Sequence, residues 1–287
     1  MKLQGRIIAA YGRQYLAELP DGTQINCVPR GKKSEVACGD HVELQRTSND
    51  QAVIEAILPR KSLLYRSVVH REKLIAANVT QVVVVVAVEP TFDDELLARC
   101  LIAAHSQDAR ALIVLNKCDL SDQAERARAC LAPYAAAGYS ILELSAKQSA
   151  EPLRPFLQGH TSVLVGQSGM GKSTLINALL PDAQAATREI SSALDSGKHT
   201  TTHARLYHLD TESDLIDCPG VQAFGLHHLS FPDIERAFPE FAPYIGQCRF
   251  YNCRHAHEPD CAIRQAAAEG KIDPRRLQLF QQISQAG

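Results

Sequence analysis

Eight residues near the middle of the chain have the spacing of a phosphate-binding loop. Residues 166–173 read Gly-Gln-Ser-Gly-Met-Gly-Lys-Ser, with an apolar segment before them and a helical pattern after them. In such a loop, backbone N–H groups and the helix N-terminus converge on phosphate oxygens, Lys172 bridges the β- and γ-phosphates and Ser173 binds Mg²⁺. The sequence therefore predicts a nucleoside triphosphate with Mg²⁺, bound by Gly166, Gln167, Ser168, Gly169, Met170, Gly171, Lys172, Ser173 and Thr174.

A second motif predicts which base is bound. Asn116, Lys117 and Asp119 follow an apolar strand, and the carboxyl ends of parallel strands line the ligand crevice of an open α/β sheet. A carboxylate at Asp119 can accept from both N1–H and the 2-amino group of guanine, a pair of donors that adenine lacks. This N-K-x-D resembles the guanine motif of GTPases. The segment Ser145, Ala146 and Lys147 resembles a further GTPase motif, whose backbone N–H contacts the guanine O6.

The remaining nucleotide contacts are expected after the phosphate loop. Residues 217–220 read Asp-Cys-Pro-Gly and resemble the D-x-P-G of GTPases, in which Asp217 reaches Mg²⁺ and the Gly220 N–H meets the γ-phosphate. A run of three threonines, residues 200–202, lies where a switch threonine completes the Mg²⁺ shell. Any of the three could serve, and we choose Thr201.

A dense cysteine and histidine cluster predicts a metal site near the C-terminus. Cys248, Cys253, His255 and Cys261 form a Cys₃His set, and soft ligands in a reducing compartment favour Zn²⁺. His257 is an alternative to His255. A closed set of four ligands leaves no position for water, so we expect one structural Zn²⁺ that stabilises a small domain.

Composition restricts the class of protein. The 287 residues are 45% hydrophobic and 22% charged, which is typical of folded proteins of two or three domains. Nine scattered cysteines indicate a reducing setting rather than a disulfide framework. The longest apolar run, residues 82–88, is too short to span a membrane, and the first residues lack a secretory signal. We therefore expect a cytoplasmic protein.

The pattern of elements changes along the chain. Residues 1–61 show short alternating apolar segments and an Asp21-Gly22 turn, which predicts a small barrel of about five strands, of the OB type. Residues 59–75 are interpreted as a linker. Strands and helices then alternate from residue 78, which predicts a doubly wound α/β domain, and the pattern after residue 231 is helical.

The order of the motifs is that of a circularly permuted GTPase, because the guanine motif at Asn116 precedes the phosphate loop at Gly166. The cut lies just beyond Gly220, so the C-terminal module follows directly on the segment that senses the γ-phosphate. A permuted GTPase domain after a barrel and before a Cys/His cluster resembles the ribosome small-subunit-dependent GTPase A family. The resemblance covers nearly the whole chain and favours His255 as the ligand.

The resemblance implies an OB-like RNA-binding barrel at 1–61, a permuted P-loop GTPase domain at 62–230 and a helical zinc domain at 231–287. It also implies that a monomer binds GTP and GDP, clasps the 30S subunit and its 16S rRNA, and hydrolyses GTP during late subunit maturation when that subunit stimulates it. The position after the D-x-P-G glycine is Val221, which cannot orient water, and the resemblance assigns that catalytic role to His199.

Two other functions can be considered, and the sequence leaves the first of them open. The chain can be an RNA-binding nucleotide switch whose hydrolysis serves only as a release timer. A P-loop ATPase or small-molecule kinase is disfavoured by Asp119. The distribution of charge adds little evidence for RNA binding, because basic residues exceed acidic ones by only two in residues 1–61 and again in 241–287. Five C-terminal arginines either meet rRNA phosphates or form a solvated face: Arg249, Arg254, Arg264, Arg275 and Arg276.

Overall fold

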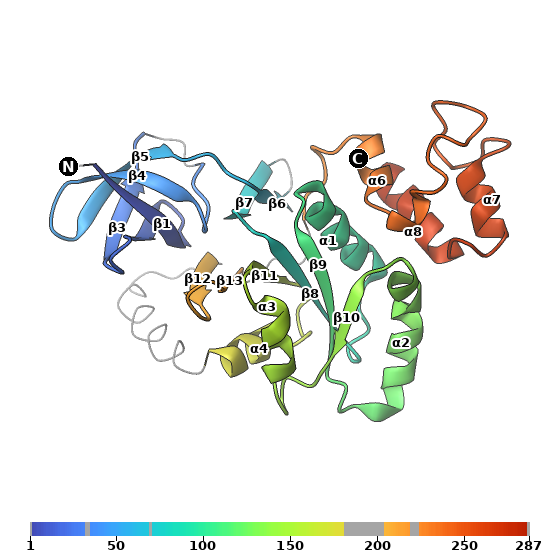
Figure 1. The fold of residues 1–287 in the computed structure, drawn as a ribbon, viewed down its shortest axis with the longest axis horizontal. Helices are drawn as coiled ribbons and strands as arrows, with labels where there is room; N and C mark the ends of the chain where they lie inside the picture. Colours follow the sequence, from blue (N-terminus) through green and yellow to red (C-terminus); the bar gives the residue numbers. More distant parts are fainter. Residues whose placement is uncertain (1, 32–34, 69–70, 181–203, 219–223, 286–287) are drawn as a thin grey trace.

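A computed structural model describes residues 2–31, 35–68, 71–180, 204–218 and 224–285. The chain forms a barrel, a central α/β layer structure and a helical C-terminal module (Figure 1). These are the three architectures that the sequence predicts. In the described residues no helix is long and apolar enough to cross a membrane.

The central sheet grows outward from one buried strand. Every residue of β8 (Gln81–Ala87) is buried, as expected of a valine-rich strand covered on both faces. The strand order is β10-β9-β8-β11-β13-β12, and all neighbours are parallel except β12 and β13. The other strands are β9 (Arg110–Asn116), β10 (Ser140–Glu143), β11 (Thr161–Val165), β12 (Ala204–His208) and β13 (Asp214–Asp217).

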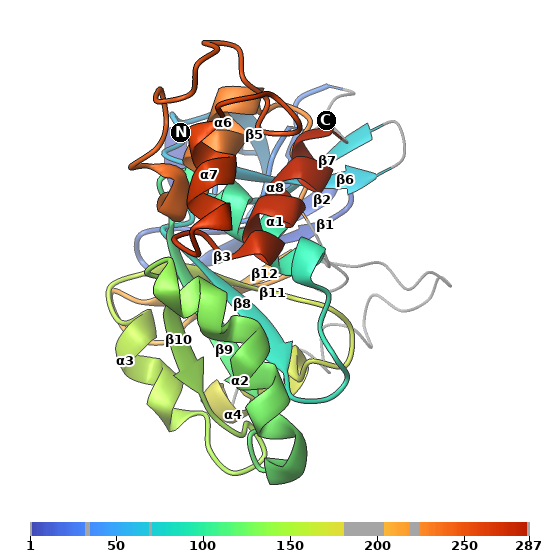
Figure 2. The same ribbon diagram turned by 90° about the vertical axis from the view of Figure 1, so that its right-hand side faces the viewer.

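Helices cover both faces of this sheet, which confirms the doubly wound arrangement (Figures 1 and 2). One face packs α1 (Asp94–Ser106) and α2 (Ser121–Ala136), and Asp93 caps α1 by accepting from two backbone N–H groups. The other face packs a 3₁₀ turn at Glu151–Leu153, α3 (Arg154–Leu157) and α4 (Lys172–Leu179).

The N-terminal strands close into a five-stranded barrel. Its strands pair in the order β1-β2-β3-β5-β4 and back to β1, with β3 and β5 parallel, which is the pairing of an OB barrel. The predicted Asp21-Gly22 turn joins β2 to β3, and Gly22 has φ +81°. The strands are β1 (Lys2–Tyr11), β2 (Gln14–Glu18), β3 (Gln24–Pro29), β4 (His41–Arg46) and β5 (Gln51–Ile57).

The barrel and the central sheet form one continuous sheet of 11 strands. The far end of β1 pairs with β12, with Ala9 opposite Arg205 and Ala10 opposite Ala204. Side chains reinforce this junction, since Arg6 of β1 forms a 2.5 Å ion pair with Asp214 of β13. Nothing in the sequence pattern predicted this pairing, because the two strands lie at distant positions in the chain.

The interpretation of residues 59–75 as a linker is wrong. They lie largely in a two-stranded antiparallel hairpin, β6 (Leu63–Val68) and β7 (Arg71–Ala77). Leu64, Ile75 and Ala76 are buried in the main core, and Cys38 forms a β-bridge with Ala76. A register shift between Leu64 and Tyr65 breaks the alternation of apolar side chains, so the sequence pattern did not indicate these strands.

The C-terminal module packs on α1 through an aromatic cluster. Phe238 stacks on Phe241, and Phe280 meets both rings edge to face, with ring centroids 5.1–5.3 Å apart. All three belong to the same core as α1 and α2. The helices of this module are α6 (Phe231–Arg236), a 3₁₀ turn at Pro239–Phe241, α7 (Ala262–Ala268) and α8 (Pro274–Gln285). Helix α8 lies against α1 (Figure 2).

Candidate functional site

The phosphate loop lies between β11 and α4, as predicted. Gly166 has φ +141°, and a β-carbon there would lie 2.2 Å from the carbonyl oxygen of Val85. Gly171 has φ +93° and directly precedes α4, which begins at Lys172. Only glycine fits these two positions without displacing its neighbours. The loop therefore presents the N-terminus of α4, the arrangement that binds phosphate in other proteins.

Lys172 and Asp217 lie at the same edge of the sheet. The Lys172 ammonium donates to the carbonyl oxygens of Gly166, at 2.5 Å, and Gln167, at 2.7 Å. Burial lowers the pKa of Lys172, and Asp217 opposes that effect. Burial likewise raises the pKa of Asp217, and Lys172 opposes it. Each side chain therefore supplies an opposite charge that partly offsets the effect of burial on the other.

Asn116 joins three loops at this edge. Its side-chain amide donates to the carbonyl oxygen of Met170 in the phosphate loop, at 2.9 Å. Its side-chain oxygen accepts from the backbone N–H of Lys117 at 2.8 Å and of Ala146 at 2.9 Å. Asn116 is 1% exposed, so these bonds form in a dry environment. The guanine motif and the phosphate loop, distant in the sequence, thus meet in one site.

The other guanine-motif residues surround Asn116. The nearby Ser145 hydroxyl lowers the pKa of Asp119. Lys117 has φ +63° and donates from its ammonium to the carbonyl oxygen of Glu89, at 2.7 Å. Asp119 is exposed and ionised, which is what a base-recognising carboxylate requires.

Three predicted site residues lie outside the described residues: His199, Thr201 and Gly220. The same applies to Val221 and to the rest of the segment from residue 181 to residue 203. Their expected roles therefore stay predictions.

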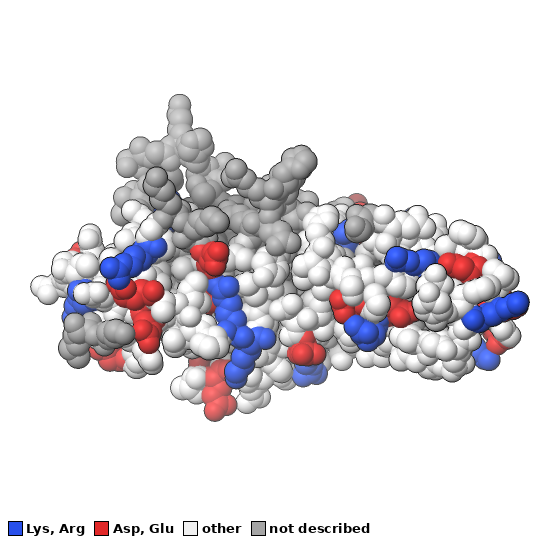
Figure 3. Space-filling view, turned by 90° about the horizontal axis from the view of Figure 1, so that it is seen from above, with Lys and Arg blue, Asp and Glu red and all other residues white. Residues whose placement is uncertain are grey.

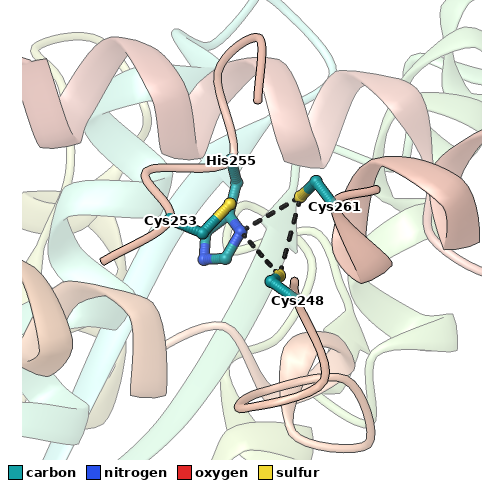
Figure 4. A group of neighbouring side chains, drawn as sticks. All are labelled: Cys248, Cys253, His255 and Cys261. Carbon is teal, nitrogen blue, oxygen red and sulfur yellow. Dashed lines mark hydrogen bonds between the residues drawn. The ribbon is translucent and has the colours of Figure 1, made fainter. Parts of the chain in front are cut away.

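The four predicted metal ligands converge (Figure 4). Their ligand atoms all lie within 4.8 Å of one another. The Cys248 sulfur is 3.8 Å from that of Cys261, and the His255 Nδ1 is 3.6 Å and 3.2 Å from these two sulfurs. A tetrahedral Zn²⁺ requires S···S of about 3.8 Å and S···N of about 3.5 Å. The set, with Cys253, can hold a metal ion of this size.

Burial alone disfavours the thiolate form of two cysteines in the cluster. Burial raises the pKa of the Cys253 thiol to about 12 and raises the pKa of Cys261 as well. A bound metal ion stabilises the thiolates that burial disfavours. His257, the alternative ligand, is not in this group.

Two carboxylates near the cluster were missed by sequence reasoning. Glu258 accepts from the backbone N–H groups of Arg254, Ala256 and His257, at 2.8–3.1 Å. Burial opposes its ionisation, but these donors outweigh burial and lower the pKa of Glu258 to about 2. Glu235 lies against His255 and is 20 residues from it in sequence, so no local spacing could have indicated it.

The five arginines differ in their surroundings. Arg276 is 2% exposed, pairs with Glu240 at 2.6 Å and lies over the ring of Tyr134, so the prediction that it faces solvent or rRNA is wrong. Arg275 pairs with Asp94. The remaining three lie around the metal loops: Arg249, Arg254 and Arg264. On the face shown in Figure 3, basic and acidic side chains interleave rather than forming a patch of one sign.

Comparisons with known proteins identify the family. The RsgA GTPase family model matches residues 57–227, more than half of the chain. The chain belongs to the RsgA GTPase family. It is 54% identical to a protein named small ribosomal subunit biogenesis GTPase RsgA from Nitrosospira multiformis, over 98% of this chain and 90% of that protein. A protein of the same name from Burkholderia pseudomallei is also 54% identical, over 98% and 91%.

Two solved structures share the fold of this chain. The crystal structure of YjeQ from Thermotoga maritima has a TM-score of 0.76 and 28% identity, and the match covers 100% of this chain and 98% of that one. The structure of YloQ, titled a circularly permuted GTPase, has a TM-score of 0.72 and 26% identity, over 100% and 95%. The chain is therefore a GTP-hydrolysing enzyme of permuted topology, as the motif order predicts.

Proposed function

We propose that this enzyme hydrolyses GTP to GDP and phosphate while bound to the small ribosomal subunit, and that it acts in late maturation of that subunit. The observation that supports the nucleotide part is the 2.9 Å bond from Asn116 to the carbonyl oxygen of Met170, which joins the segment after β9 to the loop before α4. The relatives that are 54% identical over 98% of this chain are named for small ribosomal subunit biogenesis.

Each part of the nucleotide has its own group in this proposal. Asp119 recognises the guanine edge, and the segment 145–147 contacts O6 through its backbone. The backbone of 166–174 and the Lys172 ammonium bind the phosphates. Mg²⁺, when bound, neutralises phosphate charge, and its ligands are Ser173 and Thr201, with Asp217 in its shell. The burial of Asp217 opposite Lys172 supports this assignment.

The catalytic proposal concerns His199. The residue after Gly220 is Val221, whose apolar side chain cannot orient the attacking water. We assign that role to His199 when the enzyme is docked on the subunit. Slow intrinsic hydrolysis and strong stimulation by the subunit follow from this assignment.

The flanking modules supply the subunit contacts in this proposal. We divide the chain into an RNA-binding barrel at 1–61, the GTPase domain at 62–230 and a zinc domain at 231–287, with Zn²⁺ as the structural ion held by the Cys₃His set. The short loop between Cys248 and Cys253 supports an RNA contact, because it exposes Phe250 and the whole ring of Tyr251. Exposed aromatic rings stack on unpaired bases, and Arg249 beside them can meet a phosphate. We further propose that the protein acts in the cytoplasm, as a monomer on 16S rRNA.

One experiment tests this function. GTP hydrolysis is measured for wild type and His199→Ala, with and without purified small subunits, and ATP is offered as competitor. We expect stimulation of wild type by the subunit, loss of most of that stimulation in His199→Ala with subunit binding retained, and no competition by ATP. Equal stimulated rates would remove His199 from the mechanism, and the absence of any stimulation would overturn the proposed role of the subunit.

A further inference from the structure

The imidazole of His255 has a carboxylate on the side away from the thiols. Its Nδ1 faces the sulfurs of Cys248 and Cys261, while its Nε2 lies 2.6 Å from a carboxylate oxygen of Glu235, which accepts a hydrogen bond when Nε2 carries the proton. His255 is buried, with 3% of its side chain exposed, and Glu235 is partly buried, with 14% exposed. Since one ring nitrogen is committed to Glu235, the other is the one left to bind metal.

Helix α6 holds this carboxylate in place. Ser230 and Asp233 form a capping box at its N-terminus, and Ile234 is buried in the core beside Glu235. The same helix supplies the ring of Phe231, which stacks on that of His255 with centroids 6.0 Å apart and planes 27° apart. Helix α6 therefore contacts the imidazole of His255 twice, because Glu235 meets its edge at Nε2 and Phe231 covers one face of the ring.

We propose that Glu235 is a positioning residue for the metal centre. It keeps the proton of His255 on Nε2, orients the ring so that Nδ1 faces the three thiols, and increases the donor strength of that nitrogen. The inference rests on the proposed zinc site but not on the proposed action on the ribosome. Carboxylates that contact a metal-binding histidine in this way contribute 10- to 100-fold to metal affinity in other proteins.

The proposal also links the metal to the GTPase core. Helix α6 is the first helix described after Asp217, and Phe224 and Leu226, between them, are buried in the core that contains α1. The Gly225 N–H donates to the carbonyl oxygen of Tyr65 in the hairpin, at 3.1 Å. Metal binding thus stabilises the position of α6, the helix that follows this buried segment.

Zinc affinity of the full-length protein tests the role of Glu235. Competition against a chromogenic chelator is measured for wild type, Glu235→Gln, Glu235→Ala and the control Glu269→Gln. Glu269 pairs with Lys271 on the surface of the same module. We expect about 10- to 100-fold weaker binding in Glu235→Ala, a smaller loss in Glu235→Gln, whose amide oxygen still accepts from Nε2–H, and none in the control.

A double-mutant cycle separates positioning from packing. In the His255→Cys background the site has four thiolates and no imidazole to orient, so adding Glu235→Ala should leave zinc affinity within about twofold. An equal loss in both backgrounds would overturn the proposal, as would wild-type affinity in Glu235→Ala. If Glu235→Ala fails to fold, Glu235→Gln is taken through the same cycle.

Nitrogen-15 NMR of the zinc-loaded wild type gives a direct reading of the tautomer. A protonated Nε2 and a metal-bound Nδ1 on His255 are the expected signals, and the reverse assignment would overturn the proposal. If wild type binds no zinc at all, the proposed zinc site itself fails, which is a different outcome from a wild-type site that tolerates Glu235→Ala.

Discussion

The side-chain amide of Asn116 occupies the space that a side chain at Gly171 would need. A β-carbon at residue 171 would lie 2.2 Å from the Asn116 nitrogen, and Asn116 is fixed by three hydrogen bonds. Gly171 also has φ +93°, which costs other residues about 1–2 kcal/mol. We expect Gly171→Ala to weaken GTP binding by about tenfold or more, measured by equilibrium titration with labelled nucleotide.

The matched control is Gly159→Ala. Gly159 has φ +72°, but a β-carbon added there would have no atom within 4 Å, and the residue lies before β11 rather than after it. This variant should lose stability through the same backbone strain while it binds GTP as wild type does. Equal loss of GTP binding in the two variants would contradict the role of the Asn116 contact.

Asp119 should determine the choice of base. Asp119→Ala removes the acceptor for the two guanine donors, so we expect GTP affinity to fall while the weak affinity for ATP changes little. The check is a competition titration of both nucleotides against labelled GDP. Asp108→Ala, at an exposed residue that lies just before β9, at the opposite end of the strand that Asp119 follows, is a suitable control. A retained preference for GTP in Asp119→Ala would contradict the assignment.

These predictions rest on motifs whose geometry is local, and that is why the sequence revealed them. The loop around Lys172 is positioned by the strand directly before it and the helix directly after it. The run of valines in β8 likewise indicates, without reference to other segments, that this strand is buried. Pairings between distant segments leave no such signal. The β1 to β12 contact and the bond from Glu235 to His255 depend on how whole elements pack, so only coordinates show them. The hairpin at Leu63–Ala77 was missed because its register shifts between Leu64 and Tyr65 and breaks the alternation.

Removal of the metal should destabilise the C-terminal module. Cys253, Cys261 and Phe280 belong to the core that also contains α1, so loss of metal affects packing beyond the metal loops. At free zinc about 100-fold above Kd the ion contributes about 2.7 kcal/mol, which corresponds to a fall in Tm of about 5–10 °C on chelation. Scanning calorimetry measures this shift. Cys253→Ser should start from a low Tm and respond little to chelator, and an unchanged wild-type Tm would exclude a stabilising metal.

Tyr251 should contribute to subunit binding by stacking. Its ring is fully exposed at the tip of the loop between Cys248 and Cys253. Loss of one base–aromatic stack costs about 1–3 kcal/mol, so Tyr251→Ala should bind small subunits about 5- to 150-fold more weakly, while Tyr251→Phe stays near wild type. Sedimentation with purified subunits measures the affinity. Basal GTP hydrolysis is the control and should be unchanged, and normal binding by Tyr251→Ala would exclude the stacking contact.

The junction between the barrel and the GTPase sheet should weaken as pH rises. His208 of β12 lies 2.7 Å from Glu18 of the barrel and 2.7 Å from Asp214 of β13. Burial lowers the pKa of His208, but these two hydrogen bonds outweigh burial and raise the pKa above its ordinary value of 6.5. A raised folded-state pKa adds stability that is complete below pH 6.5 and is lost as pH rises through the raised value.

The measurement compares Tm of wild type and His208→Gln across that window. Wild type should be the more stable protein in mild acid, and the difference should shrink toward zero in mild alkali. Arg6 also pairs with Asp214 and stays charged at both pH values, so it contributes no pH dependence here. His105→Gln, in the last turn of α1, is the control. A difference in Tm that is constant with pH would contradict the assignment.

The pairing of β1 with β12 has two consequences, one for aggregation and one for the movement of the barrel. An open sheet exposes an edge that can recruit a foreign strand, and here the barrel wall protects that edge from such aggregation. Strand β12 is also the first described element after the residues that include His199 and Thr201. Any shift of β12 must therefore either tilt the barrel or break the backbone hydrogen bonds between β1 and β12. The orientation of the barrel thus depends on the position of β12 at the border of the GTPase core.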